Sequence, residues 1–119
     1  FQRLETAGRQ NQILLIREYV DAHITDPALT VGSLSEQFRV APSHLTAQFQ
    51  RYFGMTLYKY IQRERLNHCR ALLENAPSMT VEELAAASGY TDLSTMYRAF
   101  KRYEGTTPGA LRTGYIRGK

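Results

Sequence analysis

Residues 49–56 read FQRYFGMT, and residues 100–107 read FKRYEGTT. Phenylalanine, arginine, tyrosine, glycine and threonine coincide at five of the eight positions, with an offset of 51 residues. Upstream of these stretches, Thr80-Val81 matches Thr30-Val31 at an offset of 50. A repeat of about 50 residues that occurs only twice indicates two copies of one structural unit, because stacked solenoids generally need at least three.

Helical periodicity dominates the chain, and no sustained alternation of apolar and polar residues indicates a strand. We therefore expect an all-α protein of about seven helices. The first amphipathic helix is expected to end near Asp26-Pro27. Its apolar residues recur at steps of three and four: Ile13, Ile16, Tyr19, Val20 and Ile24. A long helix is predicted over about 57–74, and residues 75–78 break it.

Each copy is expected to form a short helix, a tight turn and a second helix. Thr30 is the predicted N-cap of the first short helix, and Thr80 with Glu83 predicts a capping box at its counterpart. Pro42 suits the first turn of the following helix, which should stop near Gly54. This arrangement is the helix-turn-helix, whose second helix can lie in a major groove. The predicted organisation is a first helix-turn-helix subdomain at 1–56, a linker helix at 57–76 and a second subdomain at 77–119.

The net charge of +4 is unevenly distributed along the 119 residues. Residues 1–38 sum to −2, 39–70 to +5, 71–91 to −3 and 92–119 to +4. Double-stranded DNA attracts such basic blocks through phosphate neutralisation and counterion release. The alternative is that the charges only solubilise helix faces, and two basic blocks in repeated sequence argue against it.

The facing of the second helix in each copy predicts which residues can reach DNA. At about 100° per residue, apolar side chains gather on one side of each helix. These are Leu45, Phe49, Tyr52 and Phe53 in the first copy, and Met96, Ala99, Phe100 and Tyr103 in the second. The candidate DNA-binding residues of the first copy are Pro42, Ser43, His44, Thr46, Ala47, Gln50 and Arg51. Those of the second copy are Leu93, Ser94, Tyr97, Arg98, Lys101 and Arg102.

The candidate side chains suit both base and phosphate contacts. Arg98 could hydrogen-bond a guanine edge bidentately, serine and threonine can contact several bases, and the Ala47 methyl could meet a thymine methyl. Arg51, Lys101 and Arg102 lie further along their helices and suit phosphates, which set the register of a protein on DNA. Ordinary polar faces of surface helices are the alternative interpretation, and the duplicated frame favours DNA reading over it.

Motifs at fixed spacing support this interpretation. In the second copy they are Gly89-Tyr90-Thr91-Asp92, Met96, Arg98-Ala99-Phe100-Lys101, Gly105, Thr107-Pro108 and Arg112. In the long helix they are Tyr60, Arg65-Leu66 and Leu72-Leu73, and in the first copy Leu34, Pro42-Ser43, Leu45, Phe49, Gly54-Met55 and Thr56. Together these residues, from about Asn11 to Arg112, resemble the AraC/XylS family of transcription regulators.

Four residues depart from the family's pattern. Tyr90 replaces a phenylalanine, so its hydroxyl needs a place, and Met96 replaces an aromatic residue and should still fill the core. Ala41 stands where a capping serine is frequent, so the first recognition helix loses a cap worth roughly 0.5–2 kcal/mol. Cys69 stands where alanine is common and is expected to pack as a small apolar group, with a redox switch as the less favoured alternative.

The resemblance implies a DNA-binding domain whose two recognition helices enter successive major grooves of double-stranded DNA, about 34 Å apart. It also implies bacterial, cytoplasmic gene regulation, usually activation, and contact with RNA polymerase. A separate effector-binding or dimerisation domain is expected N-terminal to Phe1, so the chain is interpreted as the DNA-binding portion of a longer regulator. The competing functional class is a helical protein-interaction module whose basic surface binds an acidic partner.

The sequence predicts no enzyme. His23, His44 and His68 share no ligand spacing, so neither a metal site nor a cofactor is expected. Neither a glycine-rich phosphate loop nor a nucleophile elbow occurs. No apolar run reaches the roughly 20 residues needed to cross a bilayer, so no membrane association is expected. A single cysteine cannot build a disulfide framework and favours a reducing cytoplasm.

Overall fold

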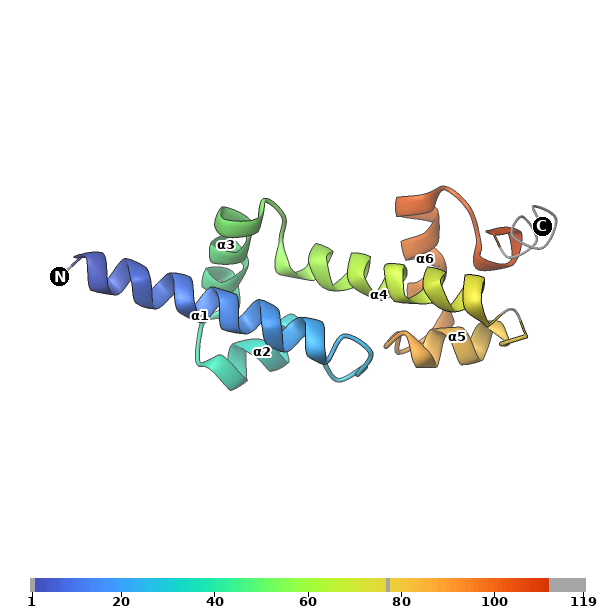
Figure 1. Ribbon diagram of the computed structural model, residues 1–119, viewed down its shortest axis with the longest axis horizontal. Coiled ribbons are helices and arrows are strands. Elements are labelled where there is room, and N and C mark those ends of the chain that lie inside the picture. Colours follow the sequence, from blue (N-terminus) through green and yellow to red (C-terminus); the bar gives the residue numbers. More distant parts are fainter. Residues whose placement is uncertain (1, 77, 112–119) are drawn as a thin grey trace. The chain divides into compact units, whose positions relative to one another are not determined.

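The computed structural model describes residues 2–76 and 78–111, with side chains described from Gln12 onward. Its helices are α1 (Gln2–Ala22), α2 (Val31–Phe38), α3 (Pro42–Phe53), α4 (Leu57–Asn75), α5 (Val81–Ala87) and α6 (Leu93–Glu104) (Figure 1). A further helical turn begins at Pro108 and is described through Leu111. The described residues contain no strand, which confirms the all-α prediction. Arg112, which belongs to the family motif, lies outside the described residues.

The helices divide into two compact units. Unit 1 comprises residues 1–23 and 28–61, and unit 2 comprises residues 24–27 and 62–119. The N-terminal end of α4 therefore belongs to unit 1 and the rest of this helix to unit 2. The short loop at 24–27 belongs to unit 2, although the chain on both sides of it belongs to unit 1. The predicted subdomain limits at residues 56 and 77 remain an interpretation, because compactness does not separate a linker helix from the units that it joins.

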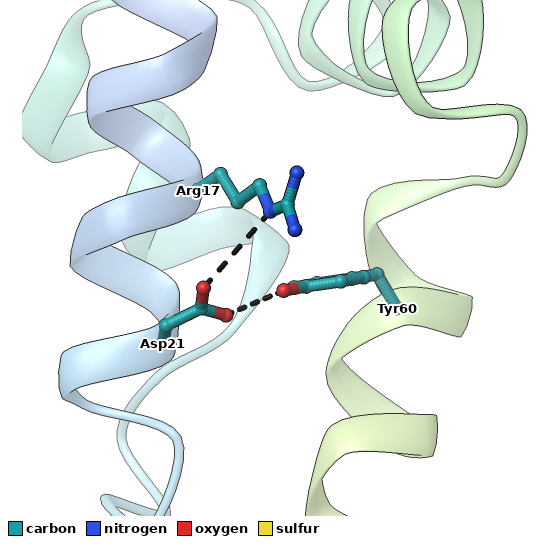
Figure 2. A network of polar contacts seen from close by, with 3 residues as sticks. All are labelled: Arg17, Asp21 and Tyr60. Carbon is teal, nitrogen blue, oxygen red and sulfur yellow. Dashed lines mark hydrogen bonds and ion pairs between the residues drawn. The ribbon is translucent and has the colours of Figure 1, made fainter.

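Unit 1 is built around apolar side chains of α1, the loop after it, α2, α3 and the start of α4. The buried ones are Ile13, Ile16, Val20, Leu29, Leu34, Leu45, Phe49, Leu57 and Ile61. The predicted N-cap is confirmed, since Thr30 Oγ1 accepts a hydrogen bond from the Ser33 backbone N–H at 3.0 Å. A polar network joins α1 to α4 (Figure 2): the Tyr60 hydroxyl donates to Asp21 at 2.5 Å, and Arg17 Nε lies 4.0 Å from the other Asp21 oxygen.

Unit 2 has its own apolar core. Its buried members are Leu66, Cys69, Leu73, Leu84, Ala85, Tyr90, Met96, Ala99 and Phe100. The predicted capping box opens α5, because Thr80 Oγ1 accepts from the Glu83 N–H at 3.1 Å and Glu83 Oε1 accepts from the Thr80 N–H at 3.2 Å. Cys69 is fully buried, as its predicted apolar packing requires. The Tyr90 hydroxyl donates to the backbone oxygen of Gln62 at 3.4 Å, which gives it the partner it needed.

Helix α1 ends earlier than its apolar pattern predicted. It stops at Ala22 rather than near residue 26, so Ile24 lies in the loop that follows. Arg65 of α4 holds this loop, since its Nε donates to the Ile24 carbonyl at 3.0 Å and its Nη2 to the Asp26 carbonyl at 2.8 Å. Burial lowers the pKa of Arg65, while the nearby Tyr90 and Asp26 raise it. This tertiary contact, which no local pattern encodes, satisfies backbone oxygens of the loop that follows α1.

The repeat also extends to the helices that support the two helix-turn-helix units. Three buried residues of α1 correspond to three buried residues of α4 at an offset of 53: Ile13 with Leu66, Ile16 with Cys69, and Val20 with Leu73. The residue types differ at every pair, so only the pattern of burial reveals the match. Each unit thus contains one supporting helix segment, one short helix and one longer helix whose outer face is exposed to solvent.

Candidate nucleic-acid interface

Helix α3 is the first candidate reading helix. It follows Ala41, which makes no side-chain capping hydrogen bond, and Pro42 occupies its first turn, as predicted. It stops at Gly54, whose φ of 78° is a left-handed conformation that a residue without Cβ adopts freely. Because Leu45 and Phe49 are buried, the opposite face is turned to solvent. The predicted residues Pro42, Ser43, His44, Ala47, Gln50 and Arg51 are exposed, and Thr46 is half-buried.

Helix α6 is the second candidate reading helix. Asp92 caps its N-terminus, and Asp92 Oδ1 accepts hydrogen bonds from the Thr95 backbone N–H at 2.7 Å and from Thr95 Oγ1 at 2.9 Å. These hydrogen bonds, the backbone one first, lower the pKa of Asp92. Met96, Ala99 and Phe100 are buried in unit 2. The predicted residues Ser94, Tyr97, Arg98, Lys101 and Arg102 are exposed.

Leu93 differs from the other residues predicted for this face. Its side chain is half-buried and packs against the core of unit 2. Part of Leu93 is therefore unavailable to a ligand. Tyr97, with 37% of its surface exposed, is a large apolar side chain that α6 presents to solvent.

The two faces differ in positive charge. The α3 face carries one exposed arginine, Arg51, whereas the α6 face carries Arg98, Lys101 and Arg102. None of these four forms an ion pair with a carboxylate within the described residues. Arg98 Nε makes only a long hydrogen bond, 3.4 Å to the backbone oxygen of Ser94. The positive charge is therefore available to an anionic ligand, and most of it lies on α6.

Sequence reasoning missed two contacts at the C-terminal ends of the reading helices. Arg70 Nη1 of α4 lies 3.0 Å from Glu104 Oε1 of α6, and the Arg17 guanidinium of α1 lies 4.9 Å from the ring centroid of Phe53 of α3. The charge blocks counted Arg70 among the cations available to DNA. The offset of 53 residues relates Arg17 to Arg70, but only the burial pattern of α1 and α4 reveals that offset, so the sequence alone carried no signal for these contacts.

The described residues offer neither a metal site nor a membrane-spanning helix. Among the described residues, no three or more histidine, cysteine, aspartate or glutamate side chains gather in a way that could hold a metal ion. None of the helices described is both long and apolar enough to span a membrane.

Sequence and structure relate this chain to known helix-turn-helix proteins. The family model described as a helix-turn-helix domain matches residues 34–114. The HTH-type transcriptional regulator YijO of Escherichia coli is 29% identical over 114 residues, which cover 95% of this chain and 40% of that protein. The melibiose operon regulatory protein of Escherichia coli is 31% identical over 87 residues, which cover 73% of this chain and 28% of that protein. The chain thus spans less than half the length of these curated relatives.

A solved structure with the same fold is the DNA-binding domain of AdpA, a global transcriptional factor, in complex with a target DNA. The TM-score is 0.81 at 19% sequence identity, and the match covers 90% of this chain and 95% of that one. At this identity the similarity concerns the fold. It confirms the predicted architecture of two helix-turn-helix units.

Proposed function

The chain belongs to the AraC/XylS-type family of helix-turn-helix transcription regulators, and from this premise we propose that it reads double-stranded DNA with α3 and α6. Each helix would enter one of two successive major grooves, about 34 Å apart for one turn of DNA. One observation carries the proposal: two helices related by an internal repeat each bury one stripe and expose a polar face. The exposed faces carry cations that form no ion pair within the described residues, one on α3 and three on α6. The subdomain limits at 1–56, 57–76 and 77–119 belong to this proposal.

The roles assigned to the side chains follow from their exposure and chemistry. Arg98 reads a guanine edge, because its guanidinium can form two parallel hydrogen bonds to O6 and N7. Ala47 offers a methyl group to thymine, and the polar side chains near it offer donors and acceptors to base edges. Arg51, Lys101 and Arg102 bind phosphates, which orient the helices without reading sequence.

Selection from a randomised duplex library tests this function. The chain is expected to enrich particular sequences, and Arg98→Ala should relax the preference at one position at a cost of about 1–3 kcal/mol. Lys101→Ala should instead weaken all sequences alike and reduce the salt slope by about 0.9 for the lost phosphate contact. Lys59→Ala is the matched control, because Lys59 is an exposed lysine of α4 outside both reading faces.

The same experiment separates DNA reading from the competing function, a basic module that binds an acidic protein. A chain of that kind would retain duplexes weakly at low salt and would select no sequence among them. The Arg98→Ala and Lys101→Ala variants would then behave alike, since only their charge would matter. Selection of no sequence by the wild-type chain at low salt contradicts direct reading of DNA by this chain.

Further parts of the proposal concern the whole protein. RNA polymerase is the proposed second partner, activation is the proposed outcome, and the bacterial cytoplasm is the proposed location. We assign the fragment no catalytic activity. An effector or dimerisation domain is proposed N-terminal to the fragment, and the large unmatched part of both Escherichia coli relatives supports it.

A further inference from the structure

An ion pair joins the last residue of α6 to α4. Arg70 Nη1 donates to Glu104 Oε1 at 3.0 Å, and both residues belong to unit 2. Glu104 is the last residue of α6, where the helix dipole disfavours a carboxylate. Its side chain is 24% exposed and that of Arg70 is 43% exposed. The pair therefore gives an otherwise unfavourable charge a partner at the end of a reading helix.

Unit 1 has an arginine at the corresponding place. Arg17 corresponds to Arg70 at the offset of the supporting helices, and Phe53 corresponds to Glu104 at the offset of the reading helices. The Arg17 guanidinium lies 4.9 Å from the centroid of the Phe53 ring, within the range of a cation–π contact. In both units an arginine of the supporting helix thus contacts the last residue of the reading helix. The contact recurs although its chemistry has changed from an ion pair to a cation–π pair.

We propose that Arg70 is a positioning residue for DNA reading, which fixes the direction of α6 through Glu104 and does not itself neutralise a phosphate. This inference rests on the proposed function of α6. Helix α6 is held at its N-terminus by the Asp92 cap and along its length by the burial of Met96 and Phe100 in the core. In the last turn, Tyr103 packs partly against this core and the Arg70 contact fixes the terminal residue, Glu104. A helix of 12 residues is about 18 Å long, so a small pivot of a released end displaces Lys101 and Arg102 relative to the phosphates.

The alternative role for Arg70 is a direct phosphate contact, as its place in the basic block at 39–70 would predict. The two roles give opposite signs for Glu104→Gln. If Arg70 positions α6, loss of the carboxylate weakens DNA binding, because the contact is broken from the other side. If Arg70 binds phosphate, loss of the carboxylate removes a repulsive charge and frees the arginine, so DNA binding tightens.

The test measures the affinity and salt slope of the full chain for its selected duplex. Arg70→Gln and Glu104→Gln are each expected to weaken binding about two- to fivefold, the range of a half-exposed ion pair, with the salt slope unchanged. The exchanged pair, Arg70→Glu with Glu104→Arg, should return the affinity to within about twofold of wild type. Arg63→Gln is the control for the loss of one positive charge, because Arg63 is an exposed arginine of the same helix.

A second readout does not depend on DNA. Amide hydrogen exchange in the last turn of α6 of the free protein should become faster in Arg70→Gln and Glu104→Gln and slow again in the exchanged pair. Tighter binding by Glu104→Gln, or a smaller salt slope in Arg70→Gln, overturns the proposal in favour of a phosphate contact. Unchanged affinity and unchanged exchange in both single variants also overturn it. If the wild-type chain selects no duplex, the proposed function fails and this inference with it, while the exchange data still report whether the contact holds α6.

Discussion

Replacement of Gly89 by alanine should destabilise unit 2 by much more than its backbone conformation alone accounts for. Gly89 has a φ of +89°, and a Cβ built there would lie 2.5 Å from the Ile24 carbonyl oxygen, 2.9 Å from Arg65 Nε and 3.0 Å from the Thr25 carbonyl carbon. Two of these atoms are backbone and cannot rotate away. The added methyl group must therefore displace the 24–27 loop or the arginine that holds it.

The expected magnitude follows from two costs. A left-handed conformation costs an L-residue about 1–2 kcal/mol. Displacement of the loop breaks at least one hydrogen bond from the Arg65 guanidinium, and a hydrogen bond to a charged group contributes about 1.5–3 kcal/mol. The sum is a loss of roughly 2.5–5 kcal/mol in the free energy of unfolding of unit 2. Gly105→Ala is the matched control, because Gly105 lies in the same unit at a φ of +68° with nothing within 4 Å of its added Cβ.

Amide hydrogen exchange of Phe100 measures the effect, because a buried core amide exchanges through unfolding of its own unit. The control should lose only the conformational cost of about 1–2 kcal/mol, so the two variants should differ by about 1.5–3 kcal/mol. Equal losses in Gly89→Ala and Gly105→Ala would refute the reasoning. They would show that the close approach of the loop contributes nothing to stability and that only the backbone conformation matters.

Three other substitutions test the packing and capping of the reading helices. Phe100→Ala removes a fully buried ring from unit 2 and should cost about 3–5 kcal/mol in urea unfolding; a cost below 1 kcal/mol contradicts its place in the core. Ala41→Ser supplies the cap that α3 lacks and should stabilise the protein by roughly 0.5–2 kcal/mol, seen as a higher Tm, whereas an unchanged Tm means that the serine makes no capping bond. The pKa of Asp92 is lowered in the folded state, so its carboxylate stabilises the fold above the ordinary value of 3.8, and this contribution is lost as the pH falls through the lowered folded-state pKa. Asp92→Asn should therefore lose less stability than wild type when the pH falls below about 4, as followed by circular dichroism. An identical loss of stability in acid for the two proteins contradicts this role of the Asp92 carboxylate.

The amino-acid sequence by itself determined the helices and the exposed faces of this protein. Capping at Thr30 and Thr80, the stops at Gly54 and Gly105, and the apolar stripes of α3 and α6 are local properties, because they depend on residues within about one or two helical turns. The internal repeat then identified two similar units. The exposure of most candidate residues follows from the burial of the opposite stripe.

Only the tertiary structure decided which charges are free and what holds the loop after α1. Arg65, Arg70 and Arg98 are indistinguishable as basic residues in the sequence, yet the first holds a loop, the second pairs with Glu104 and the third faces solvent. Arg65 and Arg70 are engaged by partners that lie 34 or more residues away in the sequence. Arg98 forms no ion pair within the described residues. Local periodicity cannot encode such contacts, because they depend on how helices pack against one another. A side chain's charge is set by its type, but its availability to DNA is set by the fold.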